Sequence, residues 1–467
     1  MPDQRFLAGN LPAAPMRRSL QHLIAATIIV SFGAPALHGQ SRALDDYVAL
    51  GLKQNLGLRQ EDLAVQRSGV ALREARGLFL PTATLNARHT DVRGQVIDFG
   101  EFINPVFSTL NQLTGTANFP TDVQLRLPLK QETSVRLAQP VFQPAIIAGY
   151  RAAGAVRDAQ EATRDARVHA VAAEIRSAYL QHAKARRLAE LRGATRLLLD
   201  EQLRVISRLI EAGRATPDAL SRARAELSDV IQREAEARQL VEASAQSFNM
   251  MLGRPLTDSV VVEAESALAF GAMPSLDEAI AAGTGRRAEL RALGAAERAA
   301  FAQRRAAQSN YLPNLAVALD YGVQGNDYRF SRDVDFTTVS VVASWNLFNG
   351  GRDAARAEQA GLEARRLALQ GEDVKRGVEL QVRLAWQAAE VARAGIATAE
   401  DQRVAAARTH ELVRRRAEEG LASPLELSQA RTQLTSAELN AVFTTYDYHL
   451  RRVDLDRAAA LYPRVTP

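Results

Sequence analysis

The feature that most constrains this chain is an internal duplication. Leu80-Pro81 closes one helical segment and Leu312-Pro313 closes another, 232 residues later; each segment opens on a Leu followed by two acidic residues. Further along, Gly213 and Gly420 begin matching Gly-x-x-[Ser/Thr]-Pro sequences. Because the matches keep the same order in both halves, we interpret the chain as two copies of one unit, residues 40–275 and 276–467.

Each copy contains one predicted hairpin of strands, within residues 80–142 and 312–348. In the second copy, apolar side chains recur at every other position of residues 315–323. This alternation is typical of a transmembrane barrel strand, apolar toward lipid and polar toward the lumen. A soluble, half-buried hairpin has the same periodicity, so the pattern alone leaves both structures open. Four aromatic residues at these strands are candidates for an interfacial girdle: Phe142, Tyr321, Trp345 and Phe348.

Four strands are too few to close a barrel, and an open sheet edge cannot lie in lipid. If these strands are in a membrane, the chain must therefore form an oligomer. Three chains would supply twelve strands, an even number within the known range for membrane barrels.

The remainder of each copy is predicted to be helical. Residues 143–212 contain one proline, at the start, and few glycines, so they can form a helix on the order of 100 Å long. Leu191, Leu198 and Val205 recur at intervals of seven, and so do Val378, Ala385 and Ala392. These intervals predict seams along which helices pair, and alanine allows close approach.

Two tight turns are expected between the long helices. Gly213 and Gly420 suit the left-handed position that ends a helix. Thr216 and Ser423 are then N-caps followed by proline at the first helical position, which predicts that another helix starts at once. Ser423 and Glu426 have the spacing of a capping box. Each copy should thus form a helical hairpin whose turn lies far from the strands.

The N-terminus predicts a signal peptide, residues 1–39. Arg17 and Arg18 precede an apolar run that is followed by small residues suited to cleavage. The run is about ten residues long, whereas a spanning helix needs roughly 20. No later segment is long and apolar enough to span a bilayer as a helix, so a membrane location requires a β-barrel.

Composition excludes several classes of function. The chain has no Cys, which excludes disulfides, thiolate metal sites and cysteine catalysis. Its 58 basic and 53 acidic residues are interleaved, which argues against nucleic-acid binding. The seven histidines are scattered without metal-ligand spacing, and there is no Gly-rich phosphate loop. We therefore expect no catalytic residues, no cofactor and no metal, and we do not expect an enzyme.

The ordered set of these segments resembles the TolC, or outer-membrane efflux protein, family over residues 40–460. No single motif is specific, but the order is. The resemblance implies a mixed α and β membrane protein: duplicated long antiparallel helical hairpins that form an α-barrel, plus four β-strands per chain in a trimeric twelve-stranded outer-membrane β-barrel. The segments that carry it are Leu80-Pro81, Gln139 to Phe142, Ala212 to Ala215, Met251 to Pro255, Leu312-Pro313, Trp345 to Gly351 and Glu419 to Ala422.

The resemblance also implies a function and partners. The homotrimer would be the outer-membrane channel of a tripartite efflux or type I secretion system, with its helical tunnel in the periplasm. It would dock on a periplasmic adaptor protein and receive substrates from an inner-membrane RND, ABC or MFS pump. The docking tips would be Gly213, Arg214, Ala215, Gly420, Leu421 and Ala422.

The expected closure of the tunnel departs from the family pattern. Some members close it with two aspartates just past the second tip, and the matching positions here are Glu426 and Gln429. Asp218, beside the first tip, is a third candidate for this periplasmic aperture. Glu426 as a capping-box residue and Asp218 as a helix N-terminal charge are the simpler explanations.

Two other functions fit parts of the pattern. A periplasmic adaptor also has helical hairpins, but would lack the duplication and carry a small β-rich module. A structural periplasmic coiled coil would need no lipid-facing strands.

The first copy carries 26 extra residues between its two strands. Leu80 precedes its counterpart in the second copy by 232 residues, whereas Phe142 precedes its counterpart by only 206. They belong to a loop, residues 92–131, at the end away from the helical tips. Its Phe, Ile and Leu content is too high for a simple solvated loop. It could be a lid over the channel mouth or a packed surface cap.

Overall fold

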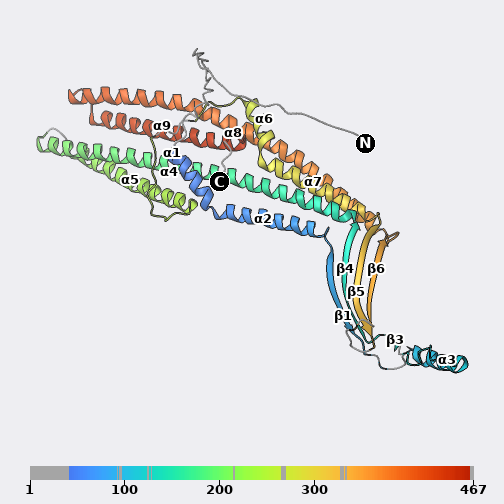
Figure 1. The fold of residues 1–467 in the computed structure, drawn as a ribbon. Helices are drawn as coiled ribbons and strands as arrows, with labels where there is room; N and C mark the ends of the chain where they lie inside the picture. Colours follow the sequence, from blue (N-terminus) through green and yellow to red (C-terminus); the bar gives the residue numbers. More distant parts are fainter. Residues whose placement is uncertain are drawn as a thin grey trace, which may run out of the picture. The chain divides into compact units, whose positions relative to one another are not determined.

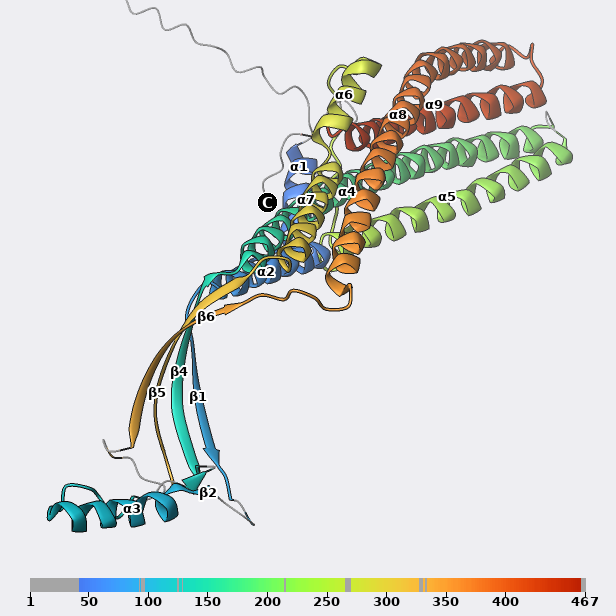
Figure 2. The same ribbon diagram turned by 90° about the vertical axis from the view of Figure 1, so that its right-hand side faces the viewer.

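The computed structural model describes residues 42–91, 93, 97–123, 126–127, 129–213, 216–264, 270–326, 331 and 334–462. The predicted signal peptide lies outside this range, and so do Arg214 and Ala215 of the first turn. The described residues form helices that run side by side and a sheet that continues from one end of them (Figures 1 and 2).

Each copy has two helices before its strands and two longer helices after them. The first copy contains α1 (Arg42–Gln54), α2 (Leu56–Gly77), α4 (Pro144–Glu211) and α5 (Pro217–Met251). The second contains α6 (Leu276–Arg286), α7 (Ala288–Ser309), α8 (Arg352–Glu418) and α9 (Pro424–Ala458). None of these described helices has a stretch long and apolar enough for a membrane span. The predicted combination of long helical hairpins and a few strands is confirmed.

Four strands form one antiparallel sheet in the order β1-β4-β5-β6. They are β1 (Thr82–His89), β4 (Gln131–Phe142), β5 (Asn314–Gly325) and β6 (Asp335–Ser344). The pairing of β4 with β5 joins the two copies, and β1 and β6 are the outer strands. Residues 92–131 contain a further two-stranded ribbon, β2 (Ile97–Asp98) with β3 (Arg126–Leu127), and the helix α3 (Phe99–Thr114).

The duplication extends to single packing contacts. Gly51 of α1 lies so close to Ile175 of α4 and Leu252 that a Cβ atom at this position would clash with both. At Gly283 of α6 a Cβ atom would clash with Val382 of α8 and would also contact Ala459 at 3.4 Å. The two contacts involve corresponding residues of the two copies. Gly283 follows Gly51 by 232 residues, and Val382 and Ala459 follow Ile175 and Leu252 by 207 residues. Both cores are built around these helix crossings, which hold the short helix of each copy against its long hairpin.

The seam on α8 follows the predicted interval of seven. Val378, Ala392, Ala399 and Ala406 are buried, and Ala385 packs partly buried between them. The seam predicted on α4 is wrong within this chain, because Leu198 is 62% exposed and Val205 is 40% exposed. Leu199 is buried instead. Leu197, Leu198 and Leu199 are consecutive, so the packing partner and not the sequence pattern decides which leucine is covered.

Charged pairs occupy the solvent side of α8. Glu and Arg residues three or four apart form ion pairs along its length, from Glu363–Arg366 to Glu411–Arg414. The two arginines that bond to Glu411, Arg414 and Arg415, lower the pKa of this carboxyl to about 2. Such exposed pairs contribute little to stability, but they suit a long helix that buries only a narrow line of small side chains.

The two copies end their last helix differently. After α5, Gly253 has φ 68° and Arg254 N–H donates to the Asn249 carbonyl, which closes the helix with a left-handed residue. After α9, Ala460 takes the same position with φ 51°, the only positive φ of a non-glycine residue in the described chain. A side chain in this conformation costs about 1–2 kcal/mol.

This difference predicts opposite effects of two matched substitutions. Ala460→Gly should stabilise the protein by about 0.5–1 kcal/mol, because it removes the strain but adds freedom to the unfolded chain. Gly253→Ala should destabilise it by about 1–2 kcal/mol through the same strain, and its Cβ would also press on Gln54. Thermal unfolding followed by circular dichroism measures both; shifts of the same sign in both variants would contradict the explanation.

Candidate functional site

The sheet has one apolar face, which is exposed. The strand register aligns Leu85, Val135 and Tyr321 in one row across β1, β4 and β5, and Leu137, Leu319 and Val339 in the next. All six side chains are exposed, from 38% for Leu319 to 71% for Leu85. A largely apolar, exposed face of this kind, interrupted by Thr133, Gln139 and Thr337, would be an association or aggregation site on a soluble chain.

The opposite face of the same strands is polar. Arg136 of β4 forms an ion pair with Asp320 of β5, with 2.9 Å between Nε and Oδ1, and Arg88 pairs with Glu132 across β1 and β4. Thr338 and Ser340 of β6 continue this face, with Phe336 and Val342 as apolar exceptions. Cross-strand pairs of opposite charge stabilise the register in addition to satisfying the charges. The alternation predicted from the sequence therefore separates an apolar face from a polar, ion-paired one.

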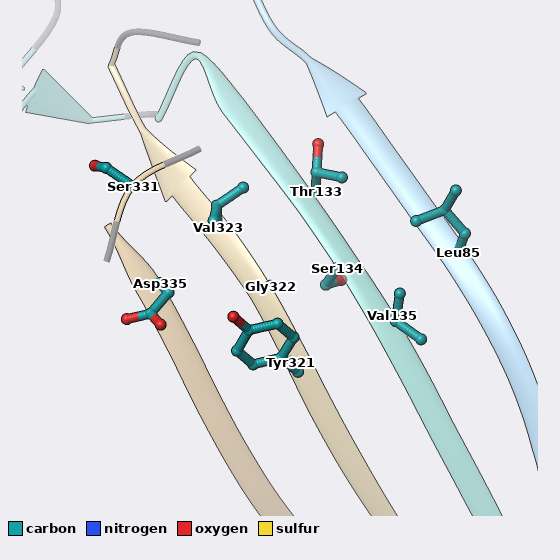
Figure 3. A pocket seen from close by; sticks show the side chains of 9 residues that line it. All are labelled: Leu85, Thr133, Ser134, Val135, Tyr321, Gly322, Val323, Ser331 and Asp335. Carbon is teal, nitrogen blue, oxygen red and sulfur yellow. The ribbon is translucent and has the colours of Figure 1, made fainter. Parts of the chain in front are cut away.

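A shallow hollow of about 320 Å³ lies on the apolar face, near the end of the strands far from the helices. Figure 3 shows Leu85, Val135, Tyr321 and Val323 on the same side of the strands, around this hollow. Its polar groups are few: mainly the hydroxyls of Thr133, Ser331 and Tyr321 and the carboxylate of Asp335. The arrangement offers contact with apolar material and no catalytic constellation among the residues described.

The four aromatic residues predicted as a girdle lie at two levels. Phe142 pairs with Leu315 at the end of the sheet next to the helices, and Trp345 and Phe348 follow directly after β6 at the same end. The Trp345 indole N–H donates to the Tyr311 carbonyl at 3.0 Å, which fixes the ring. Tyr321 lies six residues along β5 from Leu315, roughly 20 Å away at 3.3 Å per residue. The two levels are therefore roughly 20 Å apart along the strands, and the girdle stays a prediction.

The turns between the long helices have the predicted backbone. Gly213 has φ 68° and Gly420 has φ 77°. In the second turn Leu421 N–H donates to the Arg416 carbonyl at 2.7 Å, and the Leu421 side chain is 65% exposed. The structure thus places Gly213, Gly420, Leu421 and Ala422 at the ends of the two helical hairpins, and the positions of Arg214 and Ala215 are not among those described.

The helix starts after these turns differ from the prediction in detail. Ser423 Oγ accepts from the Glu426 N–H at 3.2 Å, which is one half of the predicted capping box. The Glu426 carboxylate instead lies 3.9 Å from Arg416. Thr216 occupies the first N-cap, but within the described chain its hydroxyl bonds to no backbone N–H of α5.

The three aperture candidates are all exposed. A hydrogen bond with Thr216 lowers the pKa of Asp218, with a further contribution from Arg222, whose Nη2 lies 2.6 Å from the carboxylate. Asp218 is therefore anionic at neutral pH. Glu426 and Gln429 are three residues apart on one side of α9, and Asp218 lines a cavity together with Ser423 and Pro424 at the start of that helix.

A contact that the sequence did not indicate joins the two hairpins near their tips. Arg431 of α9, only 8% exposed, forms an ion pair with Glu226 of α5, and Ser428 Oγ lies 3.3 Å from the same carboxylate. A cavity of about 230 Å³ beside this contact is lined by residues that follow both turns, among them Asp218 and Ser423. An arginine between Ala430 and Leu434 on the half-buried side of this helix is the one signal that could have pointed to it.

Comparisons with known proteins identify the second copy. Residues 282–461 match the family described as outer membrane efflux protein. The resemblance to this family predicted from the sequence is confirmed. No curated protein matches the chain.

The fold is similar to that of several solved outer-membrane channels. The chain matches CusC with a TM-score of 0.75 at 14% identity, covering 90% of this chain and 92% of that one. It matches the outer membrane protein VceC of Vibrio cholerae at 0.70 and 16%, covering 89% and 95%. It matches the MtrE outer membrane channel of Neisseria gonorrhoeae at 0.72 and 19%, covering 89% and 88%.

Proposed function

On the premise that residues 282–461 form an outer membrane efflux protein domain, we propose that the chain is the subunit of an outer-membrane channel for efflux. Three copies would combine their four-stranded sheets into a twelve-stranded barrel, and their long hairpins into a helical tunnel through the periplasm. The chain would carry no catalytic chemistry of its own.

The exposed apolar face of the sheet is the observation that carries this proposal. A face that contains Leu85, Leu319 and Val339 is costly in water at about 25 cal/mol per Å² but favourable against lipid. The opposite face, with the Arg136–Asp320 ion pair, suits a water-filled lumen. Neither a periplasmic adaptor nor a structural coiled coil requires such a sheet.

The lengths of the helices support the proposed tunnel. Helix α4 has 68 residues, which span on the order of 100 Å, and α8 has 67. Leu198 and Val205 are exposed on α4 within one chain, so another copy could cover them in the assembly. This would explain why a seam with regular spacing is left open in the single subunit.

The proposed partners act at the turns. A periplasmic adaptor would contact the exposed Leu421 and its neighbours, and an inner-membrane RND, ABC or MFS pump would supply energy. The exported substrate could be a small molecule or, in a type I secretion system, a polypeptide. A signal peptide, residues 1–39, would direct export of the chain and would then be cleaved.

Assembly tests the proposal directly. We predict that the protein is extracted from outer membranes only with detergent, as a trimer, because each chain has two outer strands with unpaired backbone groups. Light scattering with correction for bound detergent measures the mass. A monodisperse monomer that keeps its strand content without detergent would refute the channel.

The proposed docking of an adaptor at the two turns predicts a second result. Gly213→Val and Gly420→Val should each lower export while leaving trimer formation intact, because valine in a left-handed conformation costs about 1–2 kcal/mol and reshapes the turn. A Cβ at either glycine meets no atom within 4 Å, so the effect would come from the backbone alone. Gly377→Val is the matched control, since this glycine also has open space but lies in the ordinary helical part of α8. Unchanged export in both turn variants would show that the turns dock no partner.

The insert of the first copy predicts a third result. If residues 92–131 restrict the channel mouth, replacing residues 98–120 with a short Gly/Ser turn should leave the trimer intact and raise single-channel conductance. Planar-bilayer recordings compare the two proteins. Equal conductance would leave the insert as a surface cap.

A further inference from the structure

Helix α3, in the insert of the first copy, is a well-defined structural element. Asp98 caps its start by accepting from Gly100 N–H at 2.9 Å, and Gly115 ends it with φ 61°. Arg126 Nε lies 2.7 Å from the Asp98 carboxylate, and this bond is the main reason that the pKa of Asp98 is lowered. The ion pair fixes the helix start to the β2–β3 ribbon.

One side of α3 is already covered by its own chain. Asn104 donates to the Val123 carbonyl and accepts from Val123 N–H, at 3.1 and 2.9 Å. Asn111, two turns later, makes the same two bonds with Phe119, at 2.7 and 3.0 Å. Phe107 lies between the asparagines with its ring 5.7 Å from that of Phe119. The returning segment 116–123 is thus held along this side of the helix.

The other side carries an exposed apolar stripe. Phe102, Val106 and Leu113 are 70%, 55% and 78% exposed and lie on one line of the helix, at positions i, i+4 and i+11. At the base, Ile97 and Leu127 of the ribbon are also exposed. Nothing in the described part of the chain covers these side chains.

The chemistry of α3 argues against a lipid surface as the partner of this stripe. Helices that lie on membranes carry lysine and arginine on their polar side. Glu101 is the single charged residue of α3. Three exposed side chains also expose only a few hundred Å², below the roughly 800 Å² per partner of an independent protein complex. The stripe therefore fits a small contact that continues a larger interface.

The direction of α3 identifies that interface. The chain enters the insert from β1, yet in both views α3 projects beyond the β5–β6 side of the sheet (Figures 1 and 2). Strand β6 is the outer strand on that side. A second copy that adds its β1 to β6 would bring its own β2–β3 ribbon to the region that α3 reaches.

We propose that the stripe Phe102, Val106 and Leu113 of α3 docks on the base of α3 in a second copy of this chain, formed by Ile97, Phe99 and Leu127. The contact is head-to-tail, and repeated three times it closes into a ring around the outer rim. The inference rests on the proposed three-copy channel. In this arrangement the insert helps to hold the subunits together.

Because the chain has no Cys, the introduced cysteines would be the only thiols in a cross-linking test. Ile97→Cys combined with Leu113→Cys cannot form a disulfide within one chain, because the helix from Phe99 to Leu113 alone spans roughly 21 Å. Oxidation of the purified trimer should therefore give covalent dimers and trimers in denaturing gels. The control pair, Ile97→Cys with Gln112→Cys, moves the second thiol about 100° around the helix and should cross-link far less.

The outcomes separate the inference from the proposed function. A trimer by light scattering that gives no cross-link, or cross-links equally well in the control pair, would overturn the α3 contact and leave the channel intact. A fluorophore on Leu113→Cys that is quenched by brominated lipid would overturn it in favour of a membrane partner. Failure to find any trimer would overturn the proposed function and this inference with it.

Discussion

The unpaired backbone of the two outer strands is the constraint on which the rest of this account depends. β1 and β6 each present a row of N–H and carbonyl groups that no strand of the described chain satisfies. Beside an apolar face this is untenable in water, where such edges aggregate, and in lipid, where each unsatisfied group costs several kcal/mol. In the channel proposed above, further copies would pair with these edges, and the long hairpins and the insert would lie where the copies meet.

The duplication provides two hairpins of similar construction on one chain, and the copies have diverged where their surroundings differ. Asn249 is buried in the first copy and donates to the carbonyls of Leu256 and Asp258. The corresponding Asp456 lies between Arg452 and Arg176, and burial raises its pKa to about 6 against the opposing effect of both arginines. The neutral amide of Asn249 suits a site that is closed by the loop after α5. The carboxylate of Asp456 instead lies beside arginines of α4 and α9, and so it connects the first copy with the second.

Much of this fold could be predicted from the sequence, because its strongest signals are local. The Pro and Gly that bound the long helices act through backbone geometry, so the ends of α4 and the turns at Gly213 and Gly420 follow from residue type. The two faces of the sheet follow from period-two alternation.

Other features depend on contacts distant in sequence and were missed. The pattern could not select Leu199 over Leu198, nor indicate the Glu226–Arg431 pair, because both depend on which helix lies opposite. Helix α3 lies in the segment that the sequence predicts to be an apolar loop, and it contains Pro105. Its covered side depends on two asparagines that bond to a segment further along the chain.

The central claim, that one face of the sheet contacts lipid and the other water, can be measured at two adjacent residues of β6. Val339 lies on the apolar face and Thr338 on the polar one, and both are exposed in the single chain. In a background with both native tryptophans, Trp345 and Trp386, replaced by Phe, a single tryptophan would be placed at each position in proteoliposomes. The account predicts strong quenching of Val339→Trp by lipids brominated on their acyl chains and little quenching of Thr338→Trp. Equal quenching at both positions, or none at either, would contradict it.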